Sequence, residues 1–381
     1  MSRPIELLIP ASSLEVLKTA VRYGADAVYI GGEVFGLRAK AKNFSMEEMA
    51  EGIKFAHDHN VKVYVTANIL AHNYDLDGVR QYFKELNEMK PDRPDALIIS
   101  DPGVFMIAKE VCPEIERHVS TQANNTNYGT YQFWYGQGAS RVVSARELSL
   151  KEIKEIRANI PDDLEIETFI HGAMCISYSG RCLLSNYFTG RDANKGACTH
   201  PCRWKYAVVE ETRPGEYMPV YENERGTYIF NSKDLCMIEH IPEILESGID
   251  SLKIEGRMKT ALYVATVART YRQFTTGFFY GKPDENTQIY DSNTYVKEYT
   301  YLGIVGEVTD EGLCRIEQRN KFSVGEEIEI MKPDGENITT KVLQIFNEDG
   351  EEQESAPHPK QVLYIRLDQR ADHYDILRRQ E

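Results

Sequence analysis

The stretch IELLIPASSLEVLKTAVRYGADAVYI, residues 5–30, contains the pattern that decides the fold. An apolar strand pattern over 5–10 is followed by an amphipathic helix pattern over 13–24 and by a second apolar strand pattern over 27–30. Consecutive strands joined by a helix run parallel in one sheet. The stretch therefore predicts the first unit of a parallel α/β fold.

The same alternation continues to about residue 277. Further strands are predicted over 61–67, 96–100, 118–122, 141–144, 164–170 and 251–255, and further helices over 46–59, 76–89, 103–111, 128–138, 150–159, 236–248 and 260–277. Eight strand and helix pairs fit a (β/α)8 TIM-like barrel. A doubly wound open sheet is the alternative, and the lack of a Gly-rich dinucleotide motif after the first strand disfavours it.

The C-terminal part of the chain has a different pattern. After the turn-rich residues 278–290, short strands are predicted over 303–308, 313–316, 328–331, 338–345 and 361–366. We therefore expect a barrel domain at 1–285, with a cysteine-rich insertion at about 172–235, and a small all-β barrel domain at 290–381.

Charge is distributed unevenly along a chain whose net charge is −15. Residues 286–381 hold 20 acidic and 11 basic residues, which makes the C-terminal part strongly acidic. Residues 181–205 instead hold five basic residues and a single acid, interleaved with the aromatic residues Tyr187, Phe188 and Trp204. Such a basic and aromatic segment is typical of a surface that binds RNA or another anion. The alternative is a solvated loop with packed aromatic residues.

Five of the seven cysteines fall in one stretch: Cys175, Cys182, Cys198, Cys202 and Cys236. Thiolates gathered in this way hold an iron–sulfur cluster or zinc. The chain has no C-x-x-C pair, which disfavours zinc, and the wide spacing suits a cubane cluster. Inert thiols are the remaining alternative. The cysteine triad of radical S-adenosylmethionine enzymes is absent.

The chain is expected to be cytoplasmic. It contains no apolar run long enough to span a bilayer, and its start lacks the features of a signal peptide. In a reducing compartment the cysteines are not expected to form structural disulfides.

Polar residues recur where the predicted strands end. In a TIM-like barrel the chemistry lies at this end of the strands, so these side chains are site candidates: Asn68, Gln122, Arg146, His171, Glu255 and Arg257. The cysteine-rich insertion leaves from the same end.

Two motifs make the chain recognisable. The first comprises Glu167, Phe169, Gly172, Ala173, Met174, Cys175, Gly180, Cys182, Leu184 and Ser185, and the second is SKDLCMIEHIPEILESGIDSLKIEGRMKT at 232–260. Together with the N-terminal stretch and STQANNTNYG at 120–129, they resemble the peptidase U32 family. The resemblance covers essentially the whole chain and is strongest to the branch of prephenate-dependent tRNA uridine 5-hydroxylation proteins.

The resemblance implies a cofactor and a set of ligands. Proteins of this group carry a [4Fe–4S] cluster on four cysteines, and the matching positions here are Cys175, Cys182, Cys198 and Cys236. Cys202 is left over, or exchanges roles with Cys198.

The function implied is hydroxylation of tRNA uridine to 5-hydroxyuridine at the wobble position, with prephenate as co-substrate. Candidate catalytic residues are Glu167, His171 and Glu255, and candidate substrate contacts are Arg38, Asn68, Gln122, Arg146 and Arg257. Among these, Arg38, Arg146 and Arg257 are suited to a dicarboxylate. Candidate RNA contacts are Arg181, Arg191, Lys195, Arg203 and Trp204.

Two alternatives stay open. One is a U32-type peptidase, for which Cys202 and His171 would be the nucleophile and base. The other is a non-catalytic subunit that works with a paralogue. A homodimer is also expected as an assembly, and no membrane partner is.

Overall fold

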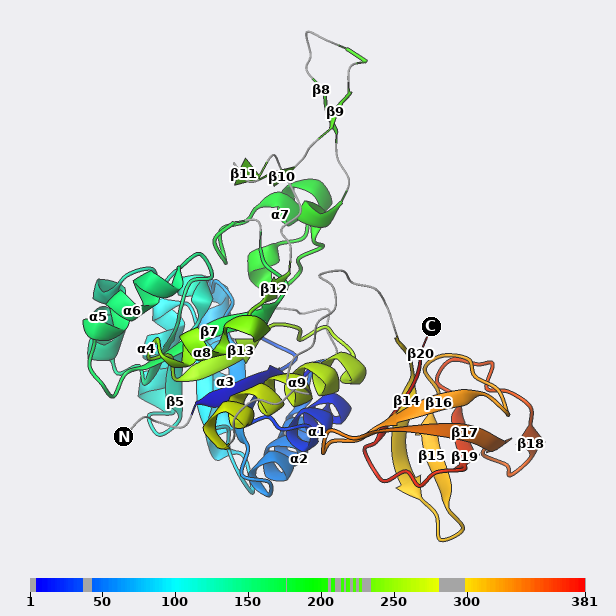
Figure 1. Cartoon of the computed structure of the whole chain (residues 1–381). Helices are drawn as coiled ribbons and strands as arrows, with labels where there is room; N and C mark the ends of the chain where they lie inside the picture. The colour runs from blue at the N-terminus through cyan, green and yellow to red at the C-terminus, as the bar shows by residue number, and fades with distance from the viewer. Residues whose placement is uncertain are drawn as a thin grey trace. The chain divides into compact units, whose positions relative to one another are not determined.

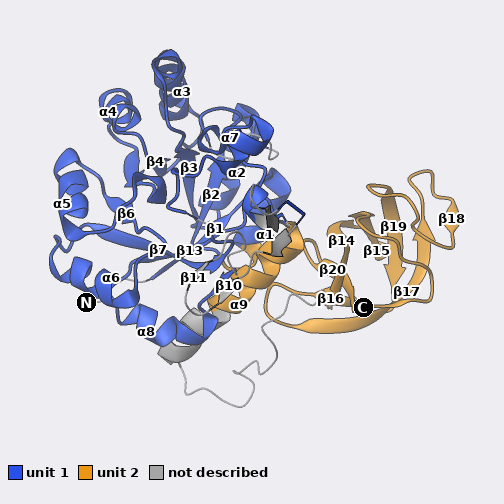
Figure 2. Ribbon diagram, turned by 90° about the horizontal axis from the view of Figure 1, so that it is seen from above, with its two compact units in different colours: residues 1–21, 25–259 blue, residues 22–24, 260–381 orange. Residues whose placement is uncertain are grey.

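The computed structural model describes residues 5–36, 43–175, 177–204, 234–280 and 299–380, and short pieces between 207 and 227. The chain forms two compact units, residues 1–21 with 25–259 and residues 22–24 with 260–381 (Figure 2). The expected boundary at 285–290 lies outside the described residues. No helix among the described residues is long and apolar enough to cross a membrane.

The first unit contains a closed barrel of eight parallel strands, which confirms the predicted (β/α)8 fold. The strands are β1 (Glu6–Pro10), β2 (Ala27–Gly31), β3 (Lys62–Ala67), β4 (Ala96–Ile99), β5 (Glu116–Val119), β6 (Arg141–Val143), β7 (Glu165–Gly172) and β13 (Ser251–Ile254). Strands β1 to β7 pair in sequence order, and β13 closes the ring by pairing with both β7 and β1.

Helices surround the strands of this unit (Figure 2). They are α1 (Leu14–Arg22), α2 (Met46–His57), α3 (Leu76–Glu88), α4 (Pro102–Val111), α5 (Tyr128–Gln137), α6 (Leu150–Ala158) and α8 (Ile241–Leu245). Several start at well-formed caps: Ser45 and Ser149 each form a capping box, and Asp101 caps α4. Each of these caps lies where a loop from the end of a strand enters the next helix. These loops together form the rim on which a TIM-like barrel carries its site.

The insertion and the last helix complete the order of elements (Figure 1). The insertion contains α7 (Leu184–Thr189), 3₁₀ turns at Ala193–Lys195 and Pro201–Arg203, and short strands β8 (Ala207–Val209), β9 (Tyr217–Pro219), β10 (Glu222–Asn223) and β11 (Gly226–Thr227). Helix α9 (Ala261–Tyr280) follows β13 and belongs to the second unit by its contacts.

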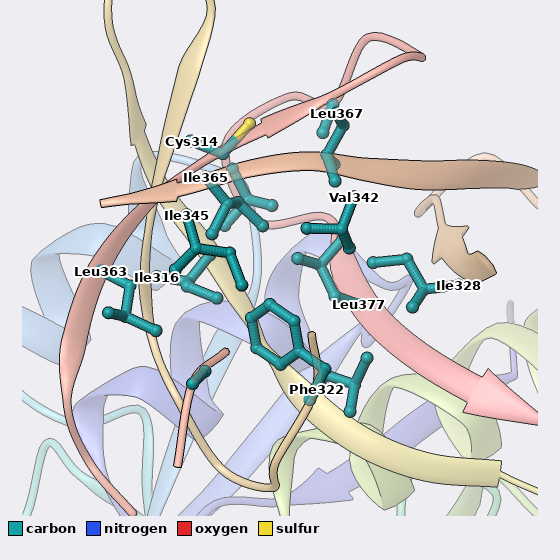
Figure 3. Packing of buried hydrophobic residues seen from close by; sticks show 14 of the residues in the cluster. Cys314, Ile316, Phe322, Ile328, Val342, Ile345, Leu363, Ile365, Leu367 and Leu377 are labelled. Atoms are coloured by element: carbon teal, nitrogen blue, oxygen red, sulfur yellow. The ribbon is translucent and has the colours of Figure 1, made fainter. Parts of the chain in front are cut away.

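The second unit contains an antiparallel β-barrel, as expected. Its strands are β14 (Tyr299–Val308), β15 (Leu313–Glu317), β16 (Glu327–Met331), β17 (Asn337–Phe346), β18 (Glu352–Gln353), β19 (Val362–Leu367) and β20 (Ile376–Gln380). The order β16-β20-β14-β15-β19-β17 closes through the β16–β17 pairing, and β18 adds to β17. Phe322 packs with Ile316, Ile345, Leu363 and Leu377 in its apolar core (Figure 3).

Two local predictions were wrong. The helix predicted over 236–248 begins only at Ile241, because Leu235 and Cys236 form a short strand, β12, that pairs antiparallel with β7. Strand β5 ends at Val119 rather than at Gln122, because a 3₁₀ turn over Thr121–Ala123 follows it. Strands β18 and β20 were not predicted.

Candidate active site at the ends of the barrel strands

The loops that follow β3, β4 and β5 are joined by short polar contacts. The Asn68 amide donates to the Ser120 hydroxyl over 3.4 Å, and the Ser100 hydroxyl donates to the Asn68 carbonyl over 3.0 Å. The hydroxyl of Thr121 donates to the Ser144 carbonyl, which extends the linkage to β6. The rim is thus a connected polar surface, and Asn68 lies within it as expected.

Arg146 is the centre of one rim cluster. Its Nη1 donates to the Ala173 carbonyl over 2.8 Å, and its Nη2 lies 3.1 Å from Glu255 Oε2. The guanidinium carbon is 3.9 Å from the ring centroid of Phe169. Loops after β6, β7 and β13 therefore converge on one cation.

Buried atoms of the rim without a hydrogen-bond partner in the described part of the chain include Nε of Arg146, Oε1 of Gln122 and Oδ1 of Asn125. A buried polar atom without a partner costs about 1–3 kcal/mol. Such atoms therefore favour a bound ligand or an ordered water at this location.

Arg257 forms a second rim cluster with the loop after β2 and the end of β3. It is 4% exposed. Its Nη1 donates to Thr66 Oγ1 over 2.7 Å, and its Nη2 is 3.5 Å from Asn43 Oδ1. A Cβ at Gly31 would lie 2.6 Å from Nη1, so a larger residue there would displace this guanidinium. Arg38, a predicted substrate contact, lies outside the described residues.

Glu167, predicted to be catalytic, lies inside the barrel. It is fully buried, with Lys253 Nζ 2.5 Å from Oε1 and Arg141 Nη1 3.1 Å from Oε2. Burial would raise the pKa of this carboxyl, but the two cations hold it below its usual range. Both oxygens are thus committed to ion pairs, which favours a structural role.

Arg141 also forms ion pairs with carboxylates other than Glu167. Arg141 also pairs with Glu165 at 2.6 Å and with Glu6 at 2.5 Å, and the hydroxyl of Ser251 donates to Glu6. We call Glu6, Arg141, Glu165, Glu167 and Lys253 the interior network.

His171 lies near the end of β7, opposite Cys236 of β12. Residues directly opposite each other on antiparallel strands project to the same face. Burial lowers the pKa of His171 below its ordinary value. Its role as a catalytic residue stays a prediction, as does that of Glu255.

Strand pairing and a hydrogen bond hold two of the segments that carry cysteines. The β7–β12 pairing places Cys236 opposite His171 and Leu235 opposite Gly172, and Cys175 follows Gly172 by three residues. The hydroxyl of Ser185, in the first turn of α7, accepts a hydrogen bond from the Thr199 N–H, which ties Cys198 to the helix that Cys182 precedes. None of the cysteines forms a disulfide, and those of the insertion are exposed or half-buried.

The donor set fits a thiolate-bound metal centre in its chemistry. Across the described residues, however, no three His, Cys, Asp or Glu side chains come together as a metal-binding group.

The expected RNA contacts have different environments. Arg181 Nε donates to Asn124 Oδ1 over 2.8 Å, which fastens the insertion to the loop after β5. Arg191 is exposed, Trp204 is 46% exposed, and Lys195 pairs with Asp75. The side chain of Arg203 lies outside the described residues.

Sequence reasoning missed the partners that hold the rim arginines, namely Thr66, Asn43 and Gly31. It also missed Lys253 and Arg141 in the barrel interior. The Gly31-Gly32 pair at the end of β2 was a usable signal, because glycine at a strand end often marks a close approach.

Comparisons with known proteins agree with the motifs. A model of "Peptidase family U32" matches residues 12–301, and a model of its C-terminal domain matches residues 297–378. The chain is 41% identical to "tRNA hydroxylation protein P1" of Bacillus subtilis, over 98% of this chain and 94% of that protein. It is 38% identical to "tRNA hydroxylation protein P" of Escherichia coli, over 96% and 94%. It is also 36% identical to "23S rRNA 5-hydroxycytidine C2501 synthase" of E. coli, over 71% of this chain and 39% of that protein.

Proposed function

Because this chain belongs to peptidase family U32, and matches relatives named for RNA hydroxylation, we propose that it is an RNA-modifying enzyme that hydroxylates uridine in tRNA. The observation that carries the proposal is the similarity to "tRNA hydroxylation protein P1" along 98% of this chain. The proposed product is 5-hydroxyuridine at the wobble position.

The rim supports an anionic co-substrate. Two guanidinium groups, of Arg146 and Arg257, are held on loops of the same barrel end, and guanidinium suits a carboxylate. We propose prephenate, a dicarboxylate, as the co-substrate. One of its carboxylates would compete with Glu255 for Arg146.

The proposed cofactor is a [4Fe–4S] cluster on Cys175, Cys182, Cys198 and Cys236. Exposed or half-buried thiols outside any disulfide are consistent with this role. A bound cluster would supply electron transfer at the rim, while the residues of this chain bind the RNA and the co-substrate. Cys236 lies in β12 and Cys175 follows the end of β7 by three residues, so two of the four proposed ligands belong to the end of the barrel strands.

Mass spectrometry of tRNA tests the activity. A strain that lacks the gene and its paralogues is expected to lose 5-hydroxyuridine, and this chain is expected to restore it. Unchanged 5-hydroxyuridine in that strain would contradict the proposal. Restoration by this chain alone would also contradict a non-catalytic role and favour a homodimer over a paralogous subunit.

Anaerobic purification tests the cofactor separately. We expect a brown protein with equal amounts of iron and sulfide, and loss of both in Cys175→Ser and Cys236→Ser. Cys112→Ser is the control, because Cys112 is buried at the end of α4, where its thiol donates to the Ala108 carbonyl. A colourless protein with stoichiometric zinc would rule the cluster out.

One observation favours a second function, a thiol peptidase. The strand register places Cys236 opposite His171, and a thiol beside an imidazole is the arrangement of a cysteine nucleophile and its base. Gelatin cleavage that Cys236→Ala or Cys202→Ala abolishes, in protein free of iron, would support it.

A further inference from the structure

The loop after β3 carries two aromatic rings stacked on each other at the barrel rim. His72 and Tyr74 have ring centroids 5.3 Å apart and planes only 6° from parallel. Both side chains are exposed, and Tyr74 is 77% exposed, so its neighbours cover only a small part of the ring. An exposed aromatic pair leaves flat apolar area in water, which is unfavourable unless a partner covers it.

Asp75 holds this pair in place. Its carboxylate accepts the His72 N–H over 2.7 Å and pairs with Lys195 of the insertion. The Leu70 N–H also donates to the Asn194 carbonyl, so the loop and the insertion are joined at two points. Lys195 Nζ lies 5.1 Å from the ring centroid of Tyr74. The rings and the ammonium group are thus preorganised on one surface.

From this geometry, and resting on the proposed function, we propose that His72 and Tyr74 form a stacking platform for an unpaired base of the RNA loop. Parallel rings match the way in which a nucleobase adds to a stack. Lys195 supplies a positive charge for a phosphate, within a segment of five basic residues and a single acid in an otherwise acidic chain.

The position of the platform fits this role. The loop begins at Asn68, whose amide is part of the connected polar rim, and the platform lies where the same loop enters α3. A base held on the platform would place its neighbours in the RNA loop at the rim. Single-stranded loops are the elements in which bases are free to stack on protein side chains.

Binding of a labelled RNA stem-loop to the full chain, measured by fluorescence anisotropy, tests the platform without requiring activity. Tyr74→Ala is expected to weaken binding by about one to two orders of magnitude, because one base–aromatic stack is lost. Tyr74→Trp should bind at least as well as the natural protein. A fully paired duplex of the same composition should bind the natural protein and Tyr74→Ala equally.

Phe133→Ala is the matched control. Phe133 is 55% exposed on α5 and contacts Trp134, so its loss removes a similar exposed ring elsewhere. Its affinity for the stem-loop should equal that of the natural protein. Lys195→Gln should weaken binding to stem-loop and duplex alike and reduce the salt dependence by about one charge.

Three results would overturn the platform: unchanged stem-loop affinity in Tyr74→Ala, an equal loss for the duplex, or an equal loss in Phe133→Ala. A failure of the proposed function would give a different set of results from a failure of the platform. Tyr74→Ala would then still lose stem-loop affinity, while deletion of the gene would leave 5-hydroxyuridine unchanged. If Tyr74→Ala bound RNA normally but failed to bind a protein partner, the platform would be a protein-docking surface instead.

Discussion

The barrel contains two groups of buried charges that differ in how completely they are paired. In the interior network, Arg141 contacts three carboxylates, and Lys253 occupies the remaining oxygen of Glu167. At the rim, the side chain of Arg146 is 9% exposed, and within the described residues Nε of Arg146 and Oε1 of Gln122 have no hydrogen-bond partner. The carboxylates of the interior network are thus all paired, while the rim keeps buried polar atoms that no described residue pairs.

This difference indicates that the interior network contributes to stability and that the rim contributes to function. A complete network leaves nothing for a ligand to bind, so its residues are expected to matter for folding. An incomplete network costs stability and is retained where a ligand completes it. Substitutions in the interior network should therefore mainly lower the free energy of unfolding, and substitutions at the rim should mainly lower activity.

The largest effect is expected for Arg141→Met. Removal of the shared cation leaves the carboxylates of Glu6, Glu165 and Glu167 without their main partner, which should cost about 3–5 kcal/mol of unfolding free energy. Denaturant unfolding of the full chain measures this. Arg80→Met is the control, because its pair with Glu110 is at the surface and should contribute little. Similar losses of unfolding free energy in both variants would show that the interior network stabilises the fold no more than a surface ion pair does.

The interior network should also make the stability of the fold depend on pH in the acid range. Burial opposes ionisation of Glu6, but the charge and hydrogen bonds of Arg141 lower its pKa from 4.5 to about 2. Because the folded value is the lower one, this contribution is complete above about pH 4.5 and is lost as the pH falls toward 2. The loss is on the order of 3 kcal/mol.

Unfolding measured at a series of pH values checks this dependence. Glu6→Gln should be less stable at neutral pH and should show a flatter acid limb than the natural protein. An acid limb of unchanged steepness in Glu6→Gln would show that other carboxylates cause it.

A smaller loss is expected for Gly31→Ala. The new Cβ would lie 2.6 Å from Arg257 Nη1, so the guanidinium has to move, at a cost of about 1–3 kcal/mol. Gly136→Ala in α5 is the control, because its Cβ would meet nothing within 4 Å and alanine favours a helix. Thermal unfolding should shift down in the first variant and not in the second. Equal shifts would show that Arg257 adapts freely.

The smallest effect on stability is expected for Arg146→Lys. The ammonium group keeps a charge near Glu255 but loses the forked contact and the packing on Phe169. Unfolding should change by less than about 1 kcal/mol, while 5-hydroxyuridine formation in the complemented strain should fall by about tenfold or more. Arg157→Lys, at the far end of the barrel, should keep its activity. Full activity in Arg146→Lys would argue against a role of the rim cluster in the reaction.

The sequence predicted the barrel because its signals are local. Apolar strands such as 27–31 and helices with a capping box, such as α2 and α6, are recognisable within a few residues. The rim residues were predictable for the same reason, since they directly follow strands.

The errors came from contacts between distant segments. Cys236 lies in β12 only because β7 is there to pair with it, and the local pattern favoured a helix. Strand β20 was missed because three of the five residues in its sequence, ILRRQ, are polar. In the structure its Arg378 pairs with Glu329. The interior network was missed because Arg141, Glu165 and Lys253 look like surface residues until the barrel closes.

The β7–β12 pairing also bears on how this protein changes over evolutionary time. The insertion leaves the barrel after Gly172 and returns at Leu235, directly opposite in the strand register. A segment anchored in this way is a closed loop, and doubling the length of a closed loop costs only about 0.6 kcal/mol. Related chains are therefore free to lengthen, shorten or exchange this segment without changing the register of a single barrel strand.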